Sequence, residues 1–124
     1  MGSERAKAVK FSDLDVWQHG HGLVVAIYKF TQLWPKEEQF GLTSQVRRAA
    51  VSITSNIAEG FSRATKSDKR HFYTMSHGSL TEVQNQLLIA RDVGFISSKE
   101  FDKLATETIT IHKLLTGLIK SLKE

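Results

Sequence analysis

The residues best able to do chemistry in this chain of 124 residues are five histidines and a few serines, because the sequence has no cysteine. His19 and His21 stand two positions apart in the stretch "HGHG", so on a helix they point to different sides and cannot easily share a metal ion. A di-iron site in a helical bundle needs glutamates together with a Glu-x-x-His pair from each of two helices. The only acid three residues before a histidine is Asp68, before His71. The sequence therefore predicts neither a metal site nor a cofactor.

Nucleophilic catalysis has no support in the sequence either. There is no cysteine, no Gly-x-Ser-x-Gly elbow and no glycine-rich loop for phosphates. The stretch "MSHGSL" places Ser76, His77 and Ser79 together only by sequence. Gly78 and Ser79 are better explained as small residues that allow a close helix crossing. We therefore predict that the protein is not an enzyme and has no catalytic residues.

Periodic apolar residues predict four helices, and no stretch alternates apolar and polar residues as a strand would. The predicted helices span residues 14–34, 43–61, 68–93 and 97–122. Asp13 and Ser67 are the expected N-caps of the first and third helices, and Ser97 with Glu100 forms a capping box at the fourth. Gly94 suits a left-handed C-terminal cap of the third helix. Since the connections are short, the predicted fold is an all-α, antiparallel up-down-up-down four-helix bundle.

The composition fits a single domain. Hydrophobic residues make up 40% of the chain, which allows one modest core at this length. We expect residues 1–12 to be a flexible basic N-terminus and residues 13–124 to form the bundle. The longest aliphatic run, Leu23 to Ile27, is far too short to span a membrane, and the first ten residues lack the apolar segment of a signal peptide. We therefore expect a cytoplasmic protein with no membrane partner.

The first predicted helix carries two apolar faces. One seam comprises Leu14, Trp17, His21, Val24 and Tyr28, and the other comprises Val16, Leu23, Ile27, Phe30 and Trp34. Two apolar faces on one helix require two partners to bury them. The second seam is therefore a candidate contact between copies of the chain, while His21 is interpreted as a hydrogen-bonded core or interface histidine.

The second predicted helix carries a polar strip beside its apolar stripe. The strip comprises Gln45, Arg48, Ser52, Asn56, Glu59 and Arg63. A solvated helix face commonly uses long lysine and glutamate side chains, whereas short serine and asparagine side chains suit the close approach of another helix. The strip is thus either plain surface or a polar contact between subunits, including the lining of a channel. Its candidate interface residues are Gln45, Ser52, Asn56 and Glu59.

The charge of the chain leaves nucleic acid open as a partner. The formal net charge is +4 and the isoelectric point is about 9.5. The densest basic stretch is "RATKSDKRH", residues 63–71, which is either a solvated turn or a patch that contacts phosphates. The candidate nucleic-acid-binding residues are Arg47, Arg48, Arg63, Lys66, Lys69 and Arg70.

Several stretches of the sequence carry a resemblance to a known family. They are "DLDVWQ" at 13–18, "IYKFT" at 27–31, "FGLTSQVRRAAVSI" at 40–53, "SNIAEGFSR" at 55–63 and "GSLTEVQNQLLIARDVGFI" at 78–96. Across almost the whole chain the sequence resembles the bacterial four-helix-bundle proteins encoded in intervening sequences of 23S ribosomal RNA genes. That family is similar in turn to the accessory variability determinant proteins of diversity-generating retroelements.

The resemblance implies a ring-shaped homopentamer with a central opening and no known catalytic activity. For the retroelement branch it also implies binding to a reverse transcriptase and to nucleic acid. Two functional hypotheses follow. The first is a non-enzymatic homo-oligomer whose basic surface binds RNA or DNA. The second is a protein-interaction scaffold or accessory subunit that does not bind nucleic acid directly.

Overall fold

The computed structural model describes residues 7–122, and within that range the chain is all-helical without a β-strand. Its elements are the 3-10 helix η1 (Phe11–Asp13), α2 (Asp15–Thr31), the 3-10 helix η2 (Lys36–Glu38), α3 (Leu42–Ser62), α4 (Lys66–Asp92) and α5 (Ser98–Lys120). The prediction of an all-α fold with four long helices is confirmed.

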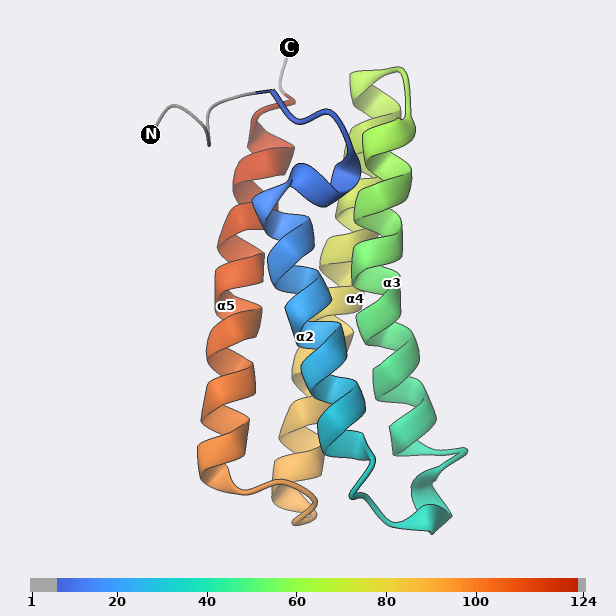
Figure 1. The fold of residues 1–124 in the computed structure, drawn as a ribbon, viewed down its shortest axis with the longest axis vertical. Helices are drawn as coiled ribbons and strands as arrows, with labels where there is room; N and C mark the ends of the chain where they lie inside the picture. Colours follow the sequence, from blue (N-terminus) through green and yellow to red (C-terminus); the bar gives the residue numbers. More distant parts are fainter. Residues whose placement is uncertain (1–6, 123–124) are drawn as a thin grey trace.

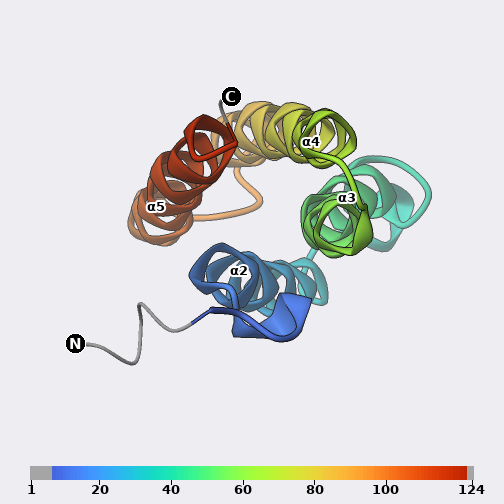
Figure 2. The ribbon, with the colours of Figure 1, turned by 90° about the horizontal axis from the view of Figure 1, so that it is seen from above.

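The four long helices lie side by side along one axis. Figure 1 shows α2 running away from the end of the bundle where η1 lies, α3 returning to that end, α4 running away again and α5 returning. Seen end-on in Figure 2, the helices follow one another around the bundle in chain order. Each helix contacts its two neighbours, and α5 closes the circle against α2. Side chains from all four helices can therefore meet in one core.

The core lies along the centre of the bundle. Its fully buried large side chains include Leu23 and Ile27 of α2, Ile53 and Ile57 of α3, Leu80, Val83 and Leu87 of α4, and Ile111 and Leu115 of α5. They recur at helical spacing, so each helix turns one apolar stripe inward. Burial of these stripes is the main force that holds the helices together.

The helix bounds differ from the predicted ones by one to three residues, and two of the predicted N-caps are wrong. Thr65, not Ser67, caps α4, because its hydroxyl accepts a hydrogen bond from the amide of Asp68 at 3.0 Å. Asp13 does not cap α2; its carboxylate accepts hydrogen bonds from the amides of Val9 and Lys10 instead, and these bonds lower its pKa. The structure does contain the predicted capping box at the start of α5 and the left-handed glycine, Gly94, with φ of 88°.

The packed part of the chain begins slightly before the predicted domain boundary at residue 13. The 3-10 helix η1 contacts both α2 and α3, and the ring of Phe11 meets that of Trp17 edge-on at 5.4 Å. Residues 1–6 of the predicted flexible N-terminus, and residues 123–124, lie outside the described range. Within the described range, no helix combines the length and the apolar character that crossing a bilayer requires.

Candidate functional site

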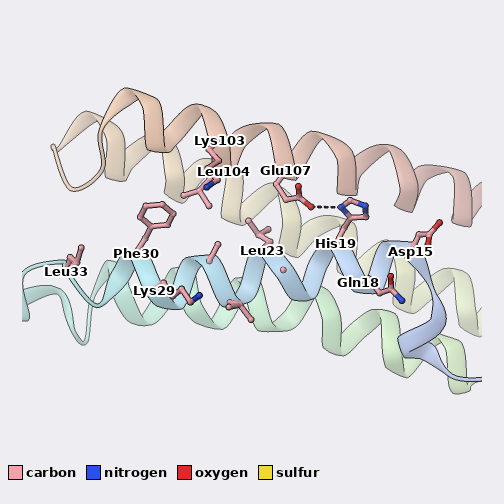
Figure 3. Close-up of a pocket in the computed structure, with 13 residues that line it drawn as sticks. Asp15, Gln18, His19, Leu23, Lys29, Phe30, Leu33, Lys103, Leu104 and Glu107 are labelled. Atoms are coloured by element: carbon pink, nitrogen blue, oxygen red, sulfur yellow. Dashed lines mark hydrogen bonds and ion pairs between the residues drawn. The ribbon is translucent and has the colours of Figure 1, made fainter.

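An apolar groove runs between α2 and α5. Its volume is about 860 Å³. Figure 3 shows that α2 forms one wall and α5 the other. The lining residues are Asp15, Gln18, His19, Gly22, Leu23, Val25, Ala26, Lys29, Phe30 and Leu33 from the α2 side, and Lys103, Leu104 and Glu107 from α5. A groove of this size with mostly apolar walls is typical of a binding surface.

Polar groups stand at the two ends of the groove. Towards one end, His19 Nδ1 lies 2.7 Å from Glu107 Oε2, a contact that joins α2 to α5 (Figure 3). Towards the other end, Lys29 and Lys103 stand beside the apolar wall. The His19 and Glu107 side chains are substantially exposed, so this pair adds little to stability. Its position instead gives the groove a polar rim that an incoming partner would meet.

The pattern of the sequence did not predict this groove as a separate surface of the first helix. On α2 it follows positions 15, 18, 22, 25, 29 and 33, spaced three and four residues apart as on one helix face. The signal in the sequence was weak because aspartate, glutamine, glycine and lysine alternate there with Val25 and Leu33. Val25 is 40% exposed and Leu33 is 86% exposed, so this face remains uncovered within the chain.

Four of the candidate interface residues on α2 and its C-terminal turn belong to the chain's own core. Val16, Leu23, Ile27 and Trp34 are each at most 7% exposed. Burial inside one bundle accounts for them without a second copy of the chain. Leu23 also reaches the floor of the groove, and the half-buried Phe30 lines its wall. Phe30 is therefore the member of this seam that is best placed to meet a partner.

Ser52 of the α3 strip meets another helix, and that helix is α4 of the same chain. Ser52 Oγ lies 2.7 Å from Ser79 Oγ, whereas Asn56 Nδ2 donates within α3, to the backbone carbonyl and hydroxyl of Ser52. Contact with α4 of the same chain therefore accounts for the small side chain at Ser52 without a second copy. Gly78 does not share this role, because a Cβ atom on it would meet nothing within 4 Å.

The remaining members of the α3 strip are exposed. Gln45 is exposed, and Glu59 pairs with Arg63 on the same helix, with Oε2 and Nη2 2.6 Å apart. Gln45 and Glu59 are thus accessible to a partner, whereas the half-buried Ser52 and Asn56 are less accessible.

The basic residues predicted to bind nucleic acid fall into two groups. Arg63, Lys66, Lys69 and Arg70 surround the turn between α3 and α4, and Arg47 and Arg48 lie near the start of α3. Since a helix rises 1.5 Å per residue, Arg48 and Arg63 are about 22 Å apart along α3. The structure thus gathers four of the six residues and separates the other two.

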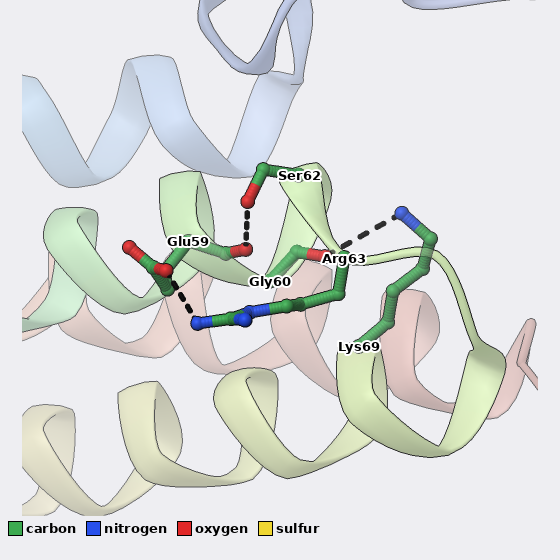
Figure 4. Close-up of polar contacts among 5 residues, drawn as sticks. All are labelled: Glu59, Gly60, Ser62, Arg63 and Lys69. Atoms are coloured by element: carbon green, nitrogen blue, oxygen red, sulfur yellow. Dashed lines mark hydrogen bonds and ion pairs between the residues drawn. The ribbon is translucent and has the colours of Figure 1, made fainter.

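Three residues of the basic turn also hold the bundle together. Lys69 Nζ donates to the carbonyl of Phe61 at 2.7 Å and more weakly to that of Gly60, so it satisfies C-terminal carbonyls of α3. Figure 4 shows the contact with Gly60. Arg70 Nη2 donates to the carbonyl of Leu122 at 2.8 Å and so ties α4 to the end of α5. The Arg63 guanidinium stacks over the Phe72 ring at 4.6 Å. Their types and positions are therefore explained in part by folding.

Arg47 makes contacts within the bundle, whereas Arg48 is exposed. Arg47 Nε donates to the hydroxyl of Thr31 at 2.8 Å, and its guanidinium lies 4.5 Å from the centre of the Tyr28 ring. It thereby links α3 to the end of α2. Arg48 is exposed, as is Lys66 at the turn. These two are the predicted basic residues most available to an anionic partner.

The histidines do not gather into a metal cluster. Within residues 7–122, no three histidine, aspartate or glutamate side chains lie close enough to hold one ion. His21 is exposed and stacks on the Trp17 ring at 4.7 Å, so it is neither a core residue nor near His19's partner, Glu107. The two histidines of "HGHG" therefore point to different surroundings, as their spacing predicted.

Together these features define a class of protein: a small all-helical bundle with an apolar groove along one side and a basic turn at one end. The model of the 23S rRNA-intervening sequence protein family matches residues 12–117, and the chain belongs to that family. The family predicted from the sequence stretches is thereby confirmed.

A solved structure supports the fold. The chain is similar to a protein of unknown function from the S23 ribosomal protein family of Bacteroides thetaiotaomicron, with a TM-score of 0.78 and 21% identity over 85% of this chain and 95% of that one. At this identity the similarity establishes the fold alone. Among curated proteins, no sequence matches the chain.

Proposed function

We propose that the protein is a non-enzymatic assembly protein whose groove between α2 and α5 receives a second copy of the chain. The observation that carries this proposal is the uncovered apolar wall of the groove, where Val25 and Leu33 remain exposed. Gly22 supports it. A Cβ atom at Gly22 would meet nothing within 4 Å, so no contact within the chain requires a glycine, although glycine weakens a helix by about 1 kcal/mol relative to alanine. Close approach by a helix of a second copy would account for a glycine at position 22.

The outer face of α4 is the surface that we propose fills the groove. Leu88, Ile89 and Val93 are all exposed there, between 42% and 57%. Figure 1 shows that α2 and α4 end, and α5 begins, at one end of the bundle. Lys29, Asp92 and Lys103 belong to these helix ends, so opposite charges would approach each other when copies stand side by side, although Asp92 also pairs with Arg91 at 2.9 Å. A contact between two different surfaces is heterologous, and copies joined in this way form a ring when the rotation from one copy to the next closes, or an open filament when it does not. We propose a ring of five, as the family resemblance implies.

Light scattering or sedimentation at micromolar concentration tests the assembly. We expect a mass of about 70 kDa, five times the 14.0 kDa of one chain. Leu33→Glu and Val25→Glu place a charge in the apolar contact and should each shift the mass towards the monomer, because burying an unpaired carboxylate is costly. The matched control is Ile109→Glu, which changes an exposed apolar residue of α5 outside the groove.

The measured masses test the assembly and its assignment to the groove separately. A wild-type mass of 14.0 kDa would rule out the assembly. A groove variant that keeps the wild-type mass, or a control that loses it, would overturn the assignment of the contact to the groove. Circular dichroism shows whether each variant keeps its helices.

A second function, binding of RNA or DNA, is favoured by the basic turn. Lys66 is exposed, and Arg63, Lys69 and Arg70 stand around it at one end of the bundle. In a ring of parallel copies these turns lie at one rim, so that each copy adds its charges to a single basic circle. Such a surface contacts phosphates without reading sequence. The alternative is an accessory subunit that binds another protein, such as a reverse transcriptase, and no nucleic acid.

Binding to RNA and duplex DNA at low salt distinguishes these two roles. We expect RNA and duplex DNA both to bind to the protein. The affinity should fall steeply as the salt concentration rises, because phosphate contacts release counterions. Lys66→Glu should weaken binding without unfolding the protein, since its side chain is exposed at the basic turn. Arg48→Glu, about 22 Å away along α3, should weaken binding less, and an equal loss would extend the binding surface to the second basic group. Lys113→Glu, an exposed lysine of α5 away from both basic groups, is the control for net charge. If neither nucleic acid binds at low salt, the nucleic-acid role is ruled out and the accessory-subunit role is favoured.

A further inference from the structure

A pair of histidines joins α4 to α5 outside the groove and outside the basic turn. His77 Nε2 lies 3.0 Å from His112 Nδ1, and the centres of the two rings are 4.7 Å apart. The two residues are 35 positions apart in the sequence, so the packing of the two helices creates the pair. Neither residue lines the groove, and neither belongs to the apolar core.

We propose that His77 and His112 form a two-histidine site for a divalent transition-metal ion, such as zinc or copper, that clamps α4 to α5. The distance between the two nitrogens supports it. A histidine nitrogen lies about 2.0–2.1 Å from a bound zinc ion, so two such ligands of one ion are roughly 3 Å apart. The pair already has this separation. In the metal-free pair one of the two nitrogens donates a hydrogen bond to the other, so binding requires that hydrogen to move to the other nitrogen of its own ring, which leaves two lone pairs for the ion.

The surroundings of the pair also suit a metal ion. His112 is exposed and His77 is half-buried, so an ion has access from solvent while one ligand is held by packing. Burial lowers the pKa of His77, and the nearby charge of His112 lowers it further. A lowered pKa keeps the imidazole neutral near neutral pH, which is the form that binds metals.

The ligand set selects the kind of ion. Imidazole nitrogens suit zinc, copper and nickel, whereas magnesium and calcium prefer oxygen ligands. Since no third histidine or carboxylate of the described chain is close enough to join, water completes the coordination. The site is therefore an open one that cross-links two helices, unlike a closed structural zinc site with four protein ligands.

Calorimetric titration of the untagged, chelator-treated protein with zinc sulfate, and separately with copper sulfate, tests the proposal. We expect one ion per chain, together with a rise in the thermal unfolding temperature, because a ligand that binds only the folded state stabilises it. His77→Ala and His112→Ala should each weaken binding by at least about tenfold, since even residues outside the first coordination sphere contribute that much. Magnesium should have no effect.

The matched control is His71→Ala, which removes an exposed histidine of α4 near the basic turn. It should bind the ion as the wild type does. The proposal is overturned if neither ion binds to the wild type, or if His112→Ala binds as tightly as His71→Ala. Electron paramagnetic resonance of the copper-loaded protein gives a second readout: two nitrogen ligands in the wild type and fewer in either alanine variant.

Discussion

Ile53→Ala is expected to lower the free energy of unfolding by about 2–5 kcal/mol, the usual cost of emptying part of a rigid core. Ile53 is fully buried at the place where three helices meet. Its Cγ2 atom lies 3.7 Å from where a Cβ atom would stand on Gly20 of α2, and its carbonyl accepts a hydrogen bond from Ser76 Oγ of α4 at 2.8 Å. These contacts fix the helices around it, so they cannot collapse into the space that alanine leaves. Since small domains have only about 5–15 kcal/mol of stability, the loss would be large.

Urea denaturation followed by circular dichroism measures this effect. Ile53→Val should cost about 0.5–1.5 kcal/mol, since it removes a single methylene group. Val51→Ala, two positions earlier on the same helix and 39% exposed, should stay within about 0.5 kcal/mol of the wild type. Equal losses for Ile53→Ala and Val51→Ala would contradict the position of Ile53 in the core. All variants must be compared at one protein concentration, because assembly would make stability depend on it.

Apolar spacing was enough to predict the fold, but it did not show which surface each stripe covers. Val16, Leu23 and Ile27 were correctly identified as residues that need a partner, and they were assigned to contacts between copies. The structure places them in the core of one chain. Periodicity describes one helix at a time, so it cannot tell a neighbouring helix of the same chain from a helix of another. The same ambiguity affected Ser52, whose partner is Ser79 of α4.

Charges were easy to locate in the sequence, whereas their contacts were not. The "RATKSDKRH" stretch, residues 63–71, was interpreted as a turn or a phosphate-contacting patch; the turn spans only residues 63–65, and residues 66–71 begin α4. That Lys69 reaches back to the end of α3, and Arg70 across to Leu122, depends on how the helix ends meet in space. The pairing of His77 with His112 is unpredictable for the same reason, because it follows from the relative shift of α4 and α5 along their axes.

The groove shows why an interaction surface is harder to predict than a core. A core stripe excludes polar residues, so it stands out in a sequence. A surface that binds a partner faces water before binding, so it carries polar residues as well as apolar ones. The α2 side of the groove accordingly mixes Lys29 and Gln18 with Val25 and Leu33. Such mixing lowers the contrast on which pattern recognition depends. Only the structure shows that these residues line one continuous hollow (Figure 3).

Gly60→Ala is expected to destabilise the protein by about 1–2 kcal/mol, although alanine is the better helix former. A Cβ atom on Gly60 would stand 2.7 Å from Tyr73 Cε1 and 3.0 Å from Phe72 Cβ, closer than packed carbon atoms allow. Tyr73 is 2% exposed, and only a short turn joins α3 to α4, so neither the ring nor the helices can move far. Overpacking of this kind typically costs about 1–3 kcal/mol. The gain in helix propensity, at most about 1 kcal/mol, offsets only part of that cost.

Gly78→Ala is the matched control, and its effect should have the opposite sign. A Cβ atom on Gly78 would meet nothing within 4 Å, so this change should stabilise α4 by about 0.5–1 kcal/mol through helix propensity alone. The two variants make the same chemical change in neighbouring helices, so unfolding in urea compares steric cost with propensity directly. Combining Gly60→Ala with Tyr73→Leu, which removes the clashing ring, should cost less than the sum of the two single changes. If Gly60→Ala stabilises the protein as Gly78→Ala does, then the close approach of α3 and α4 at this end of the bundle does not depend on Gly60.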